Sequence, residues 1–139
     1  MRTDNMAWDF DDVVDELRFL RKNEGFTPRR YYDLMVIPSL LGRRGQGFYL
    51  SRMHFVDAIH ALHDSQLRGA LLAAFGLMEG YEDYFTVQMR RERYGIEVKR
   101  GYDTLRHWED VGLEQLAAVL IKCRECGGVR YMGAVLSRE

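Results

Sequence analysis

The feature that most constrains the fold is a long apolar stripe between residues 102 and 123. Its members recur at intervals of three and four residues, the spacing that places side chains on one face of an α-helix. They are Leu105, Trp108, Gly112, Leu116, Val119, Leu120 and Cys123, with Leu113 at the edge. Asp103 or Thr104 can cap the start of such a helix, and Gly127 and Gly128 can end it. A helix this long and one-sided needs other elements packed against its apolar face.

One acidic residue interrupts the stripe. Glu109 lies between Leu105 and Leu113, and a buried carboxylate without a partner costs several kcal/mol. An arginine from the upstream cluster at 90, 91 and 93 can bind a carboxylate through two parallel hydrogen bonds. We therefore predict a structural ion pair of Glu109 with Arg90 or Arg91. The alternative is a slight rotation of the helix that lets Glu109 reach water.

The residues before the long helix outline a helix-turn-helix. A short helix over 92–98, a tight turn at 99–102 and the long helix follow one another, as in DNA-binding motifs of this kind. Two alternatives stay open. The same pair of helices can be an ordinary packing motif, and a small β-hairpin around 84–98 is favoured by the alternation of Phe85, Val87 and Met89.

The helix-turn-helix interpretation assigns roles to exposed polar residues near the turn. From Arg90 to His107 there are six Lys or Arg residues against three Asp or Glu residues. Phosphate contacts would come from Arg93, Lys99 and Arg100. The side chains that would face a major groove are Thr104, Arg106, His107 and Asp110. Of these, Arg106 and Thr104 would contact the bases.

This region also resembles a known group of proteins. The run RRERYG…GYDTLRHWEDVGLEQLAAVL is similar to the C-terminal portion of uncharacterised helical proteins of actinobacteria and their phages. Their pattern is similar in turn to the last helices of sigma-factor region 4 and of phage transcriptional regulators. The resemblance implies DNA binding. It rests on Arg90, Arg91, Thr104, Leu105, Arg106, Glu109, Asp110, Leu116, Ala117 and Leu120, and more loosely on the preceding run ALLAAFGL.

The rest of the chain predicts further helices. Apolar periodicity and capping residues indicate helices over 8–22, 28–36, 51–63 and 66–75, and a fifth over 80–89 leading into the arginine cluster. We expect an all-α fold, a compact bundle of five to seven helices. One domain would span 1–139, with flexible ends at 1–7 and 128–139. Docking of the apolar residues in the second of these ends is the alternative.

Metal and cofactor chemistry has little support in the sequence. Cys123 and Cys126 make half of a zinc site, which normally needs four ligands. Two free cysteines are the favoured interpretation. No nucleophile and base at catalytic spacing, paired acids or cofactor-binding loop occurs, so we expect neither an enzyme nor a cofactor.

Composition limits the remaining choices. The 139 residues carry a net charge of −1, whereas dedicated nucleic-acid-binding domains are usually strongly basic. The acidic N-terminal residues do not form a signal peptide, and no apolar run approaches the length of a membrane span, so we expect a cytoplasmic protein without membrane contact. We predict a transcriptional-regulator-like protein that binds double-stranded DNA, as a homodimer if its sites are two-fold. The alternative is a helical protein-interaction module, an adaptor or a phage-encoded inhibitor of a host protein, that does not bind DNA.

Overall fold

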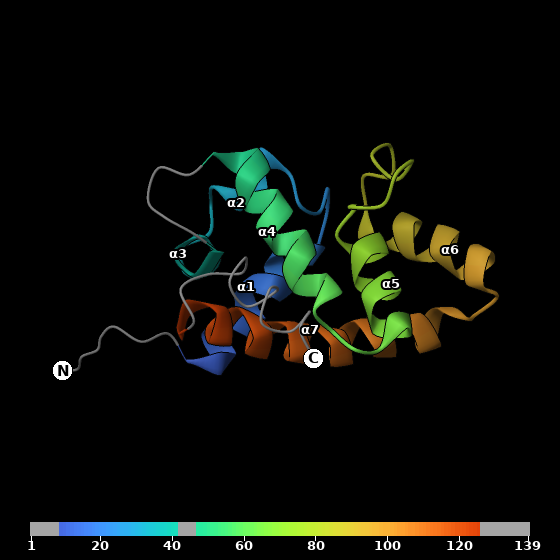
Figure 1. The fold of residues 1–139 in the computed structure, drawn as a ribbon. Coiled ribbons are helices and arrows are strands. Elements are labelled where there is room, and N and C mark those ends of the chain that lie inside the picture. The colour runs from blue at the N-terminus through green and yellow to red at the C-terminus, as the bar shows by residue number, and fades with distance from the viewer. Residues whose placement is uncertain (1–8, 42–46, 126–139) are drawn as a thin grey trace.

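Seven α-helices make up the part of the chain that the computed structural model describes, residues 9–41 and 47–125 (Figure 1). No strand occurs in these residues, so the predicted all-α class is confirmed. The helices are α1 (Phe10–Arg21), α2 (Pro28–Tyr31), α3 (Val36–Leu41), α4 (Phe48–His60), α5 (Ser65–Ala74), α6 (Val87–Val98) and α7 (Tyr102–Glu125).

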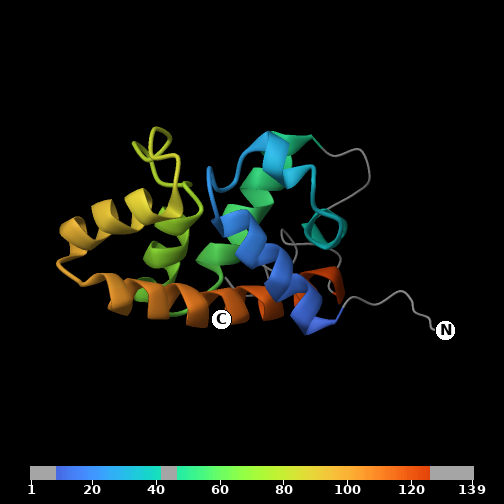
Figure 2. The same cartoon turned by 180° about the vertical axis from the view of Figure 1, so that it is seen from behind.

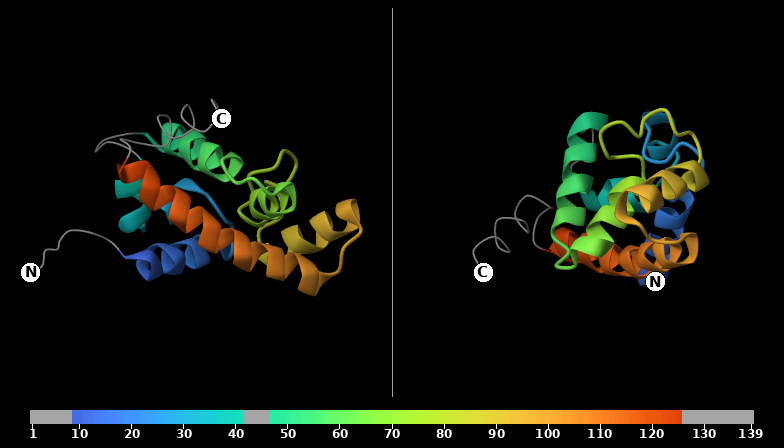
Figure 3. Two further views of the ribbon diagram at one scale, coloured as in Figure 1. Left: turned by 60° about the horizontal axis from the view of Figure 1, so that its bottom comes forward. Right: turned by 90° about the vertical axis from the view of Figure 1, so that its right-hand side faces the viewer.

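The long helix α7 is the element on which the others assemble. It packs against α1, α3, α4, α5 and α6 and runs along one side of the molecule (Figures 1 and 3). Four members of the predicted stripe are fully buried, namely Leu105, Leu113, Leu116 and Leu120, while Trp108 and Val119 are only partly buried. Ala117, which the stripe did not include, is also fully buried.

The remaining helices divide between the two ends of α7. Seen from either side, α1 to α4 gather toward its C-terminal end, and α6 lies over its N-terminal end (Figures 1 and 2). Between them α5 packs on both α6 and α7. Gly112 favours the close approach of α5 and α7, because a Cβ there would lie 3.0 Å from the Leu71 side chain. Helices α5, α6 and α7 therefore form a three-helix unit at one end of the molecule.

The first helix begins two residues later than predicted. Asp9 and Asp12 form a capping box, in which each side chain accepts a hydrogen bond from the other's backbone N–H. The apolar spacing of Phe10, Val13 and Leu17 predicts that all three face the core. Val13 and Leu17 are fully buried, but Phe10 is exposed.

The prediction of one helix over 28–36 is wrong, because the segment breaks into α2 and α3. Glu16 on α1 accepts hydrogen bonds from the N–H groups of residues 35, 36 and 37, at 2.8 to 3.1 Å. These are donors that the first turn of a helix leaves unsatisfied. Pro38 lies in that first turn, where its missing N–H costs nothing. Met35, which would face the core in a continuous helix, is exposed at the break.

The fifth predicted helix, over 80–89, is also wrong, since helical structure starts only at Val87. Thr86 caps α6 there by accepting a hydrogen bond from the Met89 N–H at 3.1 Å. Residues 78–86 form turns and bends instead. The segment for which a hairpin was the alternative is helical from Val87 to Val98.

Candidate helix-turn-helix surface

A tight turn joins α6 to α7. Lys99 takes the left-handed conformation that ends many helices, with φ 59° and ψ 48°. The Arg100 N–H donates to the Gly95 carbonyl at 3.1 Å. A Cβ at Gly95 would lie only 2.8 Å from the Arg100 carbonyl oxygen. Gly95 thus lets the chain fold back closely over the end of α6.

A buried ion pair fixes α6 against α7. Glu109, with 2% of its surface exposed, accepts two hydrogen bonds from Arg91, Nε to Oε2 at 2.7 Å and Nη2 to Oε1 at 2.6 Å. Arg91 also donates to the Tyr102 hydroxyl at 2.6 Å and stacks on its ring. Burial alone would lower the pKa of Arg91, but the hydrogen bonds to Glu109 raise it above its ordinary value. The predicted pair of Glu109 with Arg91 is present.

A third helix joins this network. Arg21, in the last turn of α1, donates to Glu109 Oε1 at 3.1 Å and to Asp110 Oδ1 at 3.0 Å. One carboxylate therefore ties α1, α6 and α7 together. Sequence reasoning missed Arg21, because nothing local marks a partner 88 residues away. The pair with Arg21 also compensates the charge of Asp110, which was predicted to face DNA.

Arg90 has a different role from the one predicted. Its side chain is fully buried, and its hydrogen bonds go to backbone carbonyls. It donates to the Ala74 carbonyl at 2.9 Å, the Tyr84 carbonyl at 2.7 Å and the Arg21 carbonyl at 3.0 Å. The Ala74 and Arg21 carbonyls belong to the last residues of α5 and α1, where the helix dipoles favour a cation. Burial lowers the pKa of Arg90 to about 10, so the guanidinium remains charged at neutral pH. Arg90 anchors α6 to the ends of two other helices.

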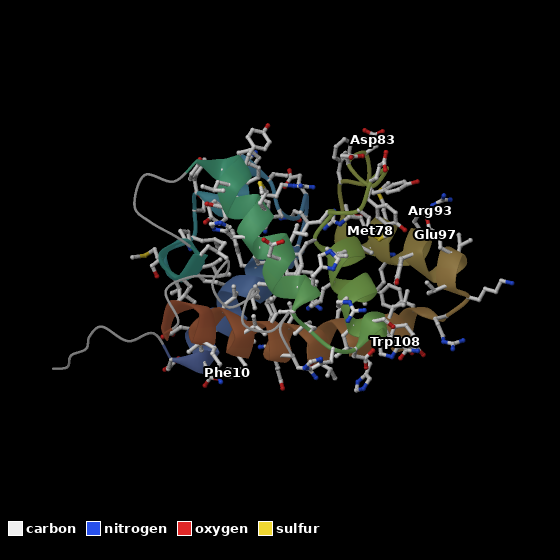
Figure 4. All side chains as sticks on the ribbon, viewed as in Figure 1. Phe10, Met78, Asp83, Arg93, Glu97 and Trp108 are labelled. Carbon is white, nitrogen blue, oxygen red and sulfur yellow. The ribbon has the colours of Figure 1, made fainter. Side chains whose placement is uncertain are left out.

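All six candidate DNA-binding residues lie exposed on α6, the turn or the start of α7. Arg93 differs from the others, because its Nε donates to Glu97 Oε2 at 3.0 Å on the outer side of α6 (Figure 4). The other five belong to the turn and the first two turns of α7. They are Lys99, Arg100, Thr104, Arg106 and His107.

A surface pocket of about 430 Å³ opens between α6 and the start of α7. Glu92 and Ile96 border it from α6, and Tyr102 and Leu105 from α7. Arg100 contributes to it from the turn. The apolar part of this pocket adjoins the outer face of α6.

The expectation of two free cysteines at 123 and 126 stays a prediction, because the structure does not test it. Cys126 and the side chain of Cys123 lie outside the described residues. Within the described ranges no group of three or more His, Cys, Asp or Glu side chains is arranged to hold a metal ion. Across residues 9–41 and 47–125, none of the helices combines the length and the apolar character that crossing a membrane requires.

Comparison of the chain with protein-family models, with curated proteins and with solved structures gives no match.

Proposed function

We propose that the protein binds double-stranded DNA through the turn between α6 and α7 and the exposed start of α7. One observation carries the proposal. The first turns of α7 are fixed on one side by buried Leu105 and Glu109, and on the other side they present Thr104, Arg106 and His107 to solvent. A recognition helix needs this combination, since its buried side sets the geometry and its exposed side contacts bases.

The arrangement around this helix also fits DNA binding. In three-helix variants of the motif, a first helix supports the pair that meets the DNA, and α5 has that position against α6 and α7. Lys99 and Arg100 lie at the turn, where phosphate contacts would position the helix. Arg93 is a weaker candidate for phosphate than the sequence suggested, because Glu97 already pairs with it.

The proposal is tested by fluorescence anisotropy with a labelled duplex over a salt series. Non-specific binding is expected in the range of about 10⁻⁴ to 10⁻⁶ M and should weaken steeply with salt. The double variant Lys99→Ala/Arg100→Ala should bind more weakly, with a salt slope lower by roughly two. Arg18→Ala/Arg29→Ala is the matched control, since it removes the same charge from exposed positions away from the turn. Equal loss of binding in both variants, or no binding at low salt, would refute the proposal.

A sequence-specific contact is tested separately. After selection of a preferred duplex from random sequence, Arg106→Ala should weaken specific binding by about 1–3 kcal/mol. Non-specific binding should change much less. An unchanged preference in this variant would remove Arg106 from the base-reading role.

A second candidate function is a protein-interaction module, and one observation favours it. Tyr49 and Met53 lie one turn apart on α4, with 78% and 59% of their surfaces exposed. Tyrosine and methionine are enriched at protein interfaces. If the anisotropy experiment shows no DNA binding, capture of a stoichiometric partner that Tyr49→Glu/Met53→Glu abolishes would support this function instead.

A further inference from the structure

The outer face of α6 carries an apolar strip that no other described element covers. Phe85, Met89 and Ile96 have exposed fractions of 62%, 44% and 73%. Met89 and Ile96 are seven residues apart, two turns of helix, and therefore lie on one face. Phe85 lies two residues before α6, next to the N-cap residue Thr86. The strip also borders the pocket between α6 and α7, to which Ile96 and Glu92 contribute.

The residues of this face are arranged symmetrically along the helix. The midpoint of α6, Val87–Val98, falls between Glu92 and Arg93. Met89 and Ile96 lie at equal distances on either side of that midpoint. If two copies of α6 are laid antiparallel about a two-fold axis there, Met89 meets Ile96 and Glu92 meets Arg93, each pair occurring twice. Apolar groups then face apolar groups, and opposite charges face each other.

We propose that the outer face of α6 binds a second copy of this chain, with the two α6 helices antiparallel across a two-fold axis between Glu92 and Arg93. A two-fold interface must be self-complementary, and the charge pattern of α6 has this property. In the dimer, Met89 of each copy lies at the rim of the pocket beside Ile96 of the other. Methionine suits this position because its flexible side chain adapts to irregular gaps.

The charges at the centre of the face are exposed and can make these pairs in addition to the contacts within their own helix. Arg93 keeps its Glu97 partner within the helix and lies half exposed. Glu92 has only a weak contact, from the Gln88 amide at 3.4 Å. Around the axis each Arg93 would therefore lie between two carboxylates, its own Glu97 and the partner's Glu92.

The dimer deepens the proposed function, and its use in DNA recognition rests on that proposal. Each α6 leads directly into the turn and the start of α7, so the dimer would place two α7 starts at its opposite ends. Dimeric helix-turn-helix proteins read two half-sites related by the same two-fold symmetry. The pairing of the two α6 helices is itself independent of DNA.

The test is an exchange of charges followed by mixing, measured by sedimentation equilibrium of the full chain without DNA. Glu92→Arg places arginines opposite each other across the axis, and Arg93→Glu places glutamates opposite each other. Each variant alone should dimerise roughly tenfold more weakly than the wild type, because two attractive pairs become repulsive. An equimolar mixture of the two variants restores every opposite-charge pair and should form a heterodimer. The double variant Glu92→Arg/Arg93→Glu should dimerise like the wild type.

Two matched substitutions of exposed methionines test whether the interface lies on α6. Met89→Glu should abolish the dimer, whereas Met53→Glu, which changes an exposed methionine on α4, should leave it intact. Circular dichroism checks that each variant keeps its helical content. A wild-type chain that stays monomeric up to roughly millimolar concentration, a mixture that does not associate, or a dimer lost only in Met53→Glu would overturn the proposal.

Failure of this proposal can be distinguished from failure of the proposed function. Lys99→Ala/Arg100→Ala should lose DNA affinity and still dimerise. Met89→Glu should lose the dimer while each monomer keeps weak, salt-dependent DNA binding. A dimer without any DNA binding would support the interface and reject the function.

Discussion

Arg90 and Arg91 are neighbouring buried cations that are stabilised by different partners. Arg91 has a carboxylate partner in Glu109. Arg90 is surrounded by backbone carbonyls from three segments. The first arrangement depends on one acidic side chain, and the second depends on where two helices end.

Removing the shared carboxylate should strongly destabilise the fold. Glu109→Ala leaves Arg91 buried without a carboxylate and Arg21 with Asp110 alone, and losses of about 3–5 kcal/mol are typical for a broken buried pair. Glu114→Ala, an exposed acid on the same helix, is the control and should change the free energy of unfolding by no more than about 0.5 kcal/mol. Urea denaturation followed by circular dichroism measures both. Similar midpoints for the two variants would show that the pair contributes little to stability.

Buried tyrosines should make stability depend on alkaline pH. Burial raises the pKa of Tyr31 and of Tyr81 above the ordinary value of 10.0. Between pH 10 and the raised values, the unfolded chain releases protons that the folded chain keeps, so the free energy of unfolding should fall as pH rises. Absorbance at 295 nm, compared with the chain in urea, reports this titration, and urea melts at pH 9 and pH 11 report stability. Tyr81→Phe should reduce the pH dependence, and an unchanged dependence would argue against the role of Tyr81.

At the scale of elements, the turn between α6 and α7 requires a glycine. Gly95→Ala should reduce stability and DNA binding despite the better helix propensity of alanine, because its Cβ would collide with the Arg100 carbonyl. Gly101→Ala is the control, since a Cβ there meets nothing within 4 Å. Thermal unfolding and duplex anisotropy are the measurements. A Gly95→Ala protein as stable as the wild type would show that the turn tolerates a shift.

The start of α3 is expected to depend on α1. Glu16→Ala removes the acceptor for three backbone N–H groups and should lower the free energy of unfolding by about 0.5–2 kcal/mol, as for other helix caps. The neighbouring variant Asp15→Ala, at an exposed position, should have little effect. Hydrogen exchange should show faster exchange of the amides at 35–37 in Glu16→Ala alone. Unchanged exchange there would mean that water replaces the carboxylate without loss.

These elements also show how far sequence reasoning reaches. The periodic pattern predicted α7 well, because it repeats over a helix of 24 residues and the packing of other helices buries its apolar face. The break between α2 and α3 could not be predicted, since its cap comes from Glu16 on another helix. The Glu109–Arg91 pair was predictable, because an acidic residue within an apolar stripe needs a partner and arginines lie nearby in the sequence. Arg21 and the carbonyl contacts of Arg90 could not be predicted, because they depend on the tertiary structure.

At the scale of the whole molecule, α7 connects the elements of both ends. Five other helices pack against it, so neither end has a separate core along this helix. We expect one cooperative unfolding transition over the described helices. Urea curves from circular dichroism at 222 nm and from tryptophan fluorescence should coincide. Two separate transitions would indicate that the α5–α6–α7 end unfolds on its own.

The sharing of Glu109 by arginines from two other helices has a consequence for how this sequence can change over evolutionary time. A lineage that loses the acid first keeps Arg91 buried without a carboxylate and Arg21 with Asp110 alone. A lineage that loses Arg91 first keeps an underpaired Glu109, so single steps at these sites pass through poorly folded intermediates. Replacement by apolar residues of similar volume is tolerable only as a concerted change. Among descendants of a common ancestor, positions 21, 91 and 109 should therefore covary, and the order of their substitutions should be far from random.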